Sequence, residues 1–141
     1  MISDIPSRFN TSQAGLPGND DSGAMASFTI FSMLGLFPNP GQNVYFITPP
    51  FFESVSVTNQ LTNRTATIRN VNFDKEYKNI YVQSAKLNGE EYTRNWIGHD
   101  FFTKGWTLEL VLGDAESAWG TRVEDRPPSV SSEQGEMKMR L

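Results

Sequence analysis

The hydrophobic pattern of this chain changes character near Pro40. Before that point, the stretch Ser22–Leu36 has the length of a helix, with polar residues suited to cap its start and Pro38 and Pro40 to stop it. Its apolar residues fall on more than one side, and they are Met25, Phe28, Ile30, Phe31, Met33, Leu34 and Phe37. We therefore expect one helix that is buried almost all round.

After Pro40 the pattern becomes that of short β-strands. The expected strands are Val44–Ile47, Ser54–Thr58, Thr65–Val71, Ile80–Leu87 and Thr107–Leu112. The pair Asn88-Gly89 predicts a hairpin, because a type I′ turn needs two residues that tolerate positive φ. The sequence thus predicts an α+β chain, with one buried N-terminal helix followed by a small antiparallel β-rich unit.

Two shorter segments complete the expected organisation. Trp96 to Lys104 favours a short helical turn ended by Gly105. From residue 114 the composition shifts to Glu, Ser, Pro and Gly, which is typical of a disordered tail. We accordingly divide the chain into residues 1–40 with the helix, 41–113 with the β-rich unit, and the tail 114–141.

Size and charge exclude several classes of function. At 141 residues the chain is long enough for one ordinary domain and too short for a large barrel, so a fragment is expected. A net charge of -4 provides no basic surface for nucleic acid or anionic membranes, and no apolar run has transmembrane length. The absence of cysteine excludes disulfides and thiolate chemistry. The N-terminus lacks the apolar core of a signal peptide, whereas Asn10-Thr11-Ser12 and Asn63-Arg64-Thr65 match N-glycosylation acceptors.

The candidate chemistry lies in Gly18-Asn19-Asp20-Asp21, just before the expected helix. A carboxylate there would lie among free backbone N–H groups at the positive end of the helix dipole, which favours its ionised form. Such a carboxylate can act as a general base toward water or help to hold a hard cation through its waters. Either Asp20 or Asp21 fits these roles, and both need an acidic partner elsewhere.

Structural interpretations compete with these roles. Asp before an apolar helix is most often only a cap. An EF-hand is excluded because Thr29 falls where the bidentate Glu is required, and a phosphate loop lacks its Gly-Lys pair. His99, the single histidine, is expected to cap or bridge a short turn. The aromatic residues Phe51, Phe52, Trp96, Phe101, Phe102 and Trp106 offer sugar-stacking surfaces, but most should be buried in a core.

A longer match adds to this interpretation. The blocks Gly15-Leu-Pro-Gly-Asn-Asp-Asp-Ser-Gly-Ala-Met-Ala-Ser-Phe, Phe31-Ser-Met-Leu-Gly-Leu-Phe-Pro, Tyr81-Val-Gln-Ser-Ala-Lys-Leu-Asn-Gly and Lys104-Gly-Trp-Thr-Leu-Glu-Leu resemble glycoside hydrolase family 92, and its fungal members in particular. The resemblance covers about Gly15 to Ser129. It implies that the helix is the last part of an (α/α)6 barrel in a secreted, exo-acting, inverting α-mannosidase.

The resemblance also implies site residues and partners. It assigns Asp20 and Asp21 as general base candidates, Gly18 and Asn19 to substrate binding, and calcium, held through water by the two aspartates, as the cofactor. The expected partners are mannose-containing glycans and the missing N-terminal part of the enzyme. The segment that carries the family's general acid has no counterpart here, so the isolated chain should be inactive. The rival interpretations are a carbohydrate-binding β-sandwich module and a non-functional remnant.

Overall fold

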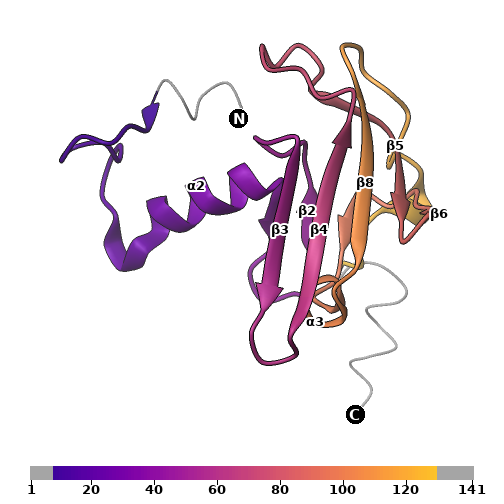
Figure 1. Cartoon of the computed structure of the whole chain (residues 1–141), viewed down its shortest axis with the longest axis horizontal. Helices are drawn as coiled ribbons and strands as arrows, with labels where there is room; N and C mark the ends of the chain where they lie inside the picture. The colour runs from indigo at the N-terminus through magenta and orange to yellow at the C-terminus, as the bar shows by residue number, and fades with distance from the viewer. Residues whose placement is uncertain (1–7, 130–141) are drawn as a thin grey trace.

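The structure is a computed structural model that describes residues 8–129. Helix α2 (Ala24–Leu34) precedes two β-sheets, which confirms the expected α+β class. Figure 1 shows the helix on one side of the sheets, joined to them at its C-terminal end. No helix within residues 8–129 is long and apolar enough to cross a membrane.

The strands form a three-stranded and a five-stranded sheet. The first has the order β1-β2-β7, with β1 at Leu36–Pro38, β2 at Tyr45–Ile47 and β7 at Trp96–Ile97. The second has the order β3-β4-β8-β5-β6, with β3 at Ser54–Asn59, β4 at Arg64–Val71, β5 at Tyr81–Leu87, β6 at Glu90–Glu91 and β8 at Thr107–Gly113. Three short helices complete the described chain: η1 (Asp21–Gly23), α3 (Asp100–Lys104) and η2 (Val123–Asp125).

One pairing departs from the expected antiparallel arrangement. Strand β8 inserts between β4 and β5, antiparallel to β5 but parallel to β4, with Ile68 opposite Leu108 and Asn70 opposite Leu110. The chain between β4 and β8 contains β5, β6, β7 and α3, which gives it the length that a parallel connection requires. The five-stranded sheet is therefore mixed.

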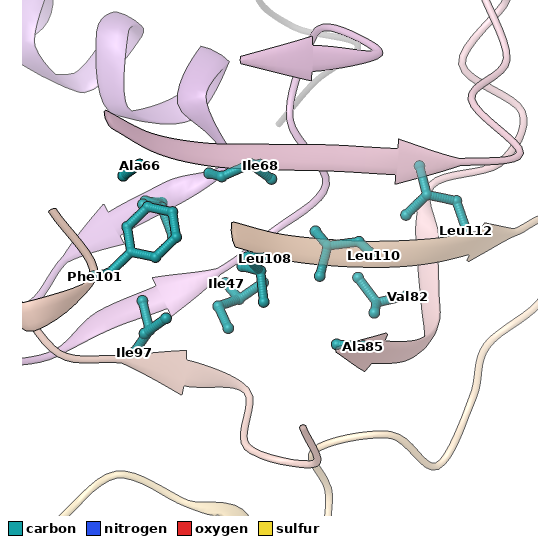
Figure 2. Packing of buried hydrophobic residues seen from close by; sticks show 11 residues of the cluster. Ile47, Ala66, Ile68, Val82, Ala85, Ile97, Phe101, Leu108, Leu110 and Leu112 are labelled. Carbon is teal, nitrogen blue, oxygen red and sulfur yellow. The ribbon is translucent and has the colours of Figure 1, made fainter. Parts of the chain in front are cut away.

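The core lies between the two sheets, where the alternating apolar residues of the strands meet. Leu108 and Leu110 on β8 are fully buried, as is Phe101 on α3. Figure 2 shows them together with the buried residues Ile47, Ala66, Ile68, Val82, Ala85, Ile97 and Leu112. This burial follows the period-two alternation of β4 and β8.

All five expected strands are confirmed to within one residue at each end, and so is the hairpin, since Asn88 and Gly89 have φ of 52° and 89°. The predicted bounds of two other elements were wrong. Helix α2 ends at Leu34 because Gly35 takes a left-handed C-cap, with φ 78°, and Leu36–Pro38 then pairs with β2. The expected turn Trp96–Lys104 splits into strand β7 and helix α3, although Gly105 does end it.

The segment from residue 114 to residue 129 is not the disordered tail that its composition indicates. The indole Nε1 of Trp119 donates a 2.8 Å hydrogen bond to the carbonyl of Tyr92, and the Trp119 ring packs against the core. Asp125 is only 2% exposed. Composition failed here because one anchoring aromatic residue and one buried carboxylate hold an otherwise polar segment on the sheet. Residues 130–141 lie outside the described residues.

Helix α2 is not enclosed by this chain. Ser32 is its only buried residue, and Ile30 is 58% exposed. Its contacts include ring contacts of Phe28 with Phe9 and Phe37 and of Phe31 with Tyr45. The burial that its all-round apolar sequence predicts is therefore not supplied by residues 8–129.

Candidate functional site

The loop Gly18–Asp21 precedes helix α2, and all four of its residues are exposed. The chain enters the helix through a tight turn in which Ser22 and Gly23 both take positive φ, 57° and 73°. The amide of Gly23 donates to the carbonyl of Asp20 at 3.0 Å, which closes this turn. The turn places two neighbouring aspartates beside the first residues of the helix.

Asp20 is the residue that caps the helix. Its Oδ1 accepts hydrogen bonds from the backbone N–H of Met25 at 2.8 Å and of Ala26 at 3.1 Å. These are two of the amides that a helix N-terminus leaves without a partner. Gly23, which occupies the cap position itself, has no side chain for this task. The prediction of a helix cap is thus confirmed for Asp20, whose side chain extends across the turn of Asp21, Ser22 and Gly23 to the helix.

Asp21 differs from its neighbour. Its side chain is exposed and forms no hydrogen bond or ion pair with any other described residue. A carboxylate in this state keeps its full capacity to accept hydrogen bonds, from water or from a sugar hydroxyl. The two aspartates therefore have separate environments: Asp20 is used by the helix, and Asp21 has no side-chain partner among residues 8–129.

Gly18 and Asn19 lie in the same loop. Gly18 has φ 76° and a Cβ placed on it would meet nothing within 4 Å, so its glycine is required by backbone conformation and not by space. The four predicted site residues are brought together because they are contiguous. Within residues 8–129 the structure places no cluster of three or more His, Asp or Glu side chains suited to a metal ion.

Calcium fits this loop only in part. Calcium takes six to eight oxygen ligands, whereas this chain offers the free carboxylate of Asp21 and the remaining oxygen of Asp20. Two neighbouring carboxylates can form one side of such a site, and the other ligands have to come from elsewhere. Residues 8–129 do not by themselves form a calcium site.

The remaining candidates are structural. His99 occupies the N-cap position of α3 without a side-chain capping hydrogen bond, and its Nδ1 lies 3.0 Å from the hydroxyl of Tyr45, so it bridges two elements as predicted. Of the six aromatic residues, only Phe101 is buried, and Phe51, Trp96, Phe102 and Trp106 are half-buried, so the expected burial is met only in part. The exception is Phe52, which is 44% exposed and contacts Phe51 edge-on.

A second polar cluster, which sequence reasoning missed, joins the C-terminal segment to the sheet. Asp125 accepts hydrogen bonds from Arg122 Nε at 2.8 Å and from the hydroxyl of Thr93. The hydrogen bond from Arg122 is the main cause that lowers the pKa of Asp125. Both carboxylate oxygens of Asp125 accept hydrogen bonds within the fold, so this cluster holds the C-terminal segment against the residues that follow β6. A polar, Pro-containing composition hid it from sequence reasoning.

Comparison with known proteins defines the class of protein. The family model described as the glycosyl hydrolase family 92 catalytic domain matches residues 3–114. The chain belongs to this family of glycosidases. Its sequence is 67% identical over 128 residues, or 91% of the chain, to an uncharacterized secreted glycosidase of Arthroderma benhamiae. The chain spans 17% of the length of that relative.

Solved structures agree with this assignment. The chain is similar to the family GH92 α-mannosidase BT3965 of Bacteroides thetaiotaomicron in complex with mannoimidazole, with a TM-score of 0.82 and 25% identity. That match covers 94% of this chain and 17% of the other. It is also similar to the inverting mannosidase BT2199 of the same organism, with a TM-score of 0.80 and 27% identity over 93% of this chain and 18% of the other.

Proposed function

We propose that this chain supplies the aspartate side of the catalytic pair of an inverting α-mannosidase that removes terminal α-linked mannose from glycans. Family membership and the names of the solved relatives, an α-mannosidase and an inverting mannosidase, support the substrate and the stereochemistry. The observation that carries the proposal is local. Asp20 fixes the loop to the helix, and Asp21 beside it keeps a free, exposed carboxylate.

We assign the general base to Asp21. An inverting glycosidase needs a carboxylate that removes a proton from water on the face of the sugar opposite the departing oxygen. Asp21 has the lone pairs to do so, whereas Asp20 already accepts two amide hydrogen bonds. Asp20 positions the loop, and Gly18 and Asn19 form the part of it that faces the sugar. Both aspartates are proposed to contribute, through water, to a calcium site completed by other segments.

The other half of the catalytic pair has to come from outside these 141 residues. General acid and general base act in one transition state, on opposite sides of the sugar, so the base alone gives almost no turnover. The exposed apolar side of helix α2, marked by Ile30, supports a partner that is also helical, as in the barrel that the resemblance implies. We propose that this partner is the acid-bearing part of the enzyme. The secreted relative supports a location in the secretory pathway.

The test is complementation. The purified chain is mixed, or co-expressed, with the part of the Arthroderma relative that lies outside the matched region, and mannose release from an α-linked mannobiose is measured in calcium buffer. We expect no release by either part alone, release by the mixture, and β-mannose as the first anomer seen by NMR. Asp21→Asn should lower kcat/KM by about 10²–10⁴-fold. Release of mannose by this chain alone, or full activity of Asp21→Asn, would contradict the proposal.

One observation favours a second function, a carbohydrate-binding module. Phe52 is 44% exposed, and the neighbouring rings of Phe51 and Tyr77 lie 5.1 Å apart, which forms an aromatic surface next to β3. Sugars bind such surfaces by stacking. This function predicts that the chain alone binds mannan and that Phe52→Ala abolishes binding, whereas Asp21→Asn leaves it unchanged. The catalytic proposal predicts instead that Asp21→Asn nearly abolishes mannose release in the complementation assay and that Phe52→Ala leaves it unchanged.

A further inference from the structure

The sequence Asn63-Arg64-Thr65 begins on the last residue of the β3–β4 loop and runs into β4, and its geometry supports an inference beyond the proposed function. Figure 1 shows this hairpin loop at one end of the five-stranded sheet, on a different element from the loop before α2. Asn63 is the last residue before β4 and is exposed, as are the residues on both sides of it. The acceptor triplet is therefore at the surface of the folded chain.

Among residues 8–129, no hydrogen bond of the fold uses the side chain of Asn63. Its φ of 50° is in the left-handed region, which asparagine adopts more readily than most residues. The loop is instead held by Asn59, whose Oδ1 accepts from the amides of Leu61 at 3.0 Å and Thr62 at 3.2 Å. Asn63 forms no hydrogen bond through its side chain with another described residue. Its amide nitrogen can thus carry a substituent without breaking a contact.

The third residue of the triplet is also well placed. Thr65 is the second residue of β4, pairs with Thr58 on β3 and is exposed, and its hydroxyl lies 3.0 Å from that of Thr58. The residue between, Arg64, is not proline, as the acceptor motif requires. All three positions are compatible with modification of the folded chain.

The other triplet, at Asn10, is in a more crowded setting. The amide of Asn10 donates to the carbonyl of Gly15 at 3.0 Å, and its Oδ1 accepts from the amide of Ser12 at 3.0 Å. A Cβ placed on Gly15 would lie 1.9 Å from the carbonyl oxygen of Asn10. Asn10 is thus part of a tight turn, whereas Asn63 stands free.

We propose that Asn63 is an N-glycosylation site of this protein. In the reaction, Nδ2 of Asn63 loses a proton and forms a bond to the anomeric carbon of a lipid diphosphate-linked oligosaccharide, whose bond to the lipid diphosphate breaks. The co-reactant and its transferase belong to the eukaryotic secretory pathway, where N-linked glycans are attached to Asn-X-Ser/Thr triplets. The proposal requires secretion of the chain but no mannosidase activity, so the two proposals fail independently.

The experiment secretes the full chain from a fungal host behind a cleavable signal peptide, in an Asn10→Gln background that leaves only the Asn63 triplet. We expect most of the secreted protein to carry one N-glycan, visible as a mobility shift that peptide-N-glycosidase removes. Asn63→Asp keeps a residue that tolerates positive φ, and Thr65→Val keeps the branched shape; both should abolish the shift. Thr65→Ser, which keeps the hydroxyl, should retain it.

Peptide mapping of the wild-type protein provides a readout that does not depend on any variant. After peptide-N-glycosidase treatment, glycosylated Asn63 is converted to aspartate, and mass spectrometry locates the change in the peptide that contains β3 and β4. An unmodified Asn63 in secreted wild-type protein, or a mobility shift that survives Asn63→Asp in the Asn10→Gln background, would overturn the proposal.

Discussion

The Oδ1 atom of Asp20 lies 2.8 Å from the backbone nitrogen of Met25, five residues further along the chain. This hydrogen bond spans the turn of Ser22 and Gly23 and ties the loop to the first turn of helix α2. It also separates the two neighbouring aspartates, because Asp21 forms no comparable bond within the described chain. The pair is therefore one positioning carboxylate and one free carboxylate.

This difference predicts unequal effects on stability. Asp20→Ala removes the acceptor of two helix amides and should lower the free energy of unfolding by about 0.5–2 kcal/mol. Asp21→Ala removes an exposed side chain without such a contact and should change it by less than about 0.5 kcal/mol. Urea unfolding followed by circular dichroism measures both. If the two variants lost equal amounts of stability, the hydrogen bonds of Asp20 would not distinguish its role from that of Asp21.

The left-handed cap at the end of helix α2 predicts a strong requirement for glycine. Gly35 has φ 78°, and a Cβ placed on it would lie 2.5 Å from the carbonyl oxygen of Thr48. Gly41 has a similar φ of 75° but nothing within 4 Å of such a Cβ, so it serves as the matched control. Gly41→Ala should cost about 1–2 kcal/mol through backbone strain alone. Gly35→Ala should cost about 1–3 kcal/mol more, because the methyl group clashes with backbone.

Thermal or urea unfolding of the two alanine variants measures this difference. If Gly35→Ala and Gly41→Ala were equally stable, the close approach of Thr48 to the helix end would not contribute.

The environment of Asp125 predicts a dependence of stability on pH. The hydrogen bond from Arg122, followed by that from Thr93, holds the pKa of Asp125 below its ordinary value of 3.8. A carboxyl group with a lowered pKa in the folded state stabilises the protein above the ordinary value, and this contribution is lost as the pH falls below it. Wild-type protein should thus lose stability below about pH 4 more steeply than Asp125→Asn.

Glu124→Gln is the control for this experiment. Glu124 also pairs with Arg122, at 3.5 Å, but its side chain is 66% exposed, so its effect should be small. Urea unfolding at several pH values between 3 and 7 measures the slopes. A wild-type slope equal to that of Asp125→Asn would contradict the prediction.

Helix α2 has an exposed apolar side, and we predict that a charge placed there prevents assembly with the acid-bearing part of the enzyme. Ile30 is 58% exposed in this chain, so Ile30→Glu should leave its circular dichroism spectrum unchanged. If the helix packs against the acid-bearing part, the same change buries a charge at the interface and should abolish complementation. Leu61→Glu, at a position that is 98% exposed on the β3–β4 loop, should have no effect on either measurement. Full complementation by Ile30→Glu would exclude this face as the interface.

Local sequence determined most of the elements. The alternation of Leu108, Leu110 and Leu112 fixed both the strand β8 and its buried side, because strand geometry places every second residue on one face. The turn at Asn88-Gly89 was predictable for a similar reason, since few residue pairs accept positive φ twice. The candidate site was predictable as well, because its four residues are contiguous and precede a helix.

Tertiary structure decided what alternation and composition do not encode. The parallel pairing of β4 with β8 could not be predicted, because periodicity shows which face of a strand is buried and carries no information on its partner strands. The order in the segment from residue 114 to residue 129 depends on Trp119 reaching the carbonyl of Tyr92. The assignment of the cap to Asp20 required the left-handed turn at Ser22, a residue type that rarely adopts it.

The sequence by itself thus determined the family, most of the elements and the position of the aspartate pair, because these follow from local patterns and contiguous residues. Only the tertiary structure decided which aspartate is engaged and which is free. It also decided which triplet stands clear of the fold and which side of helix α2 lacks a partner. These properties depend on distances between residues separated along the chain, which are set by folding.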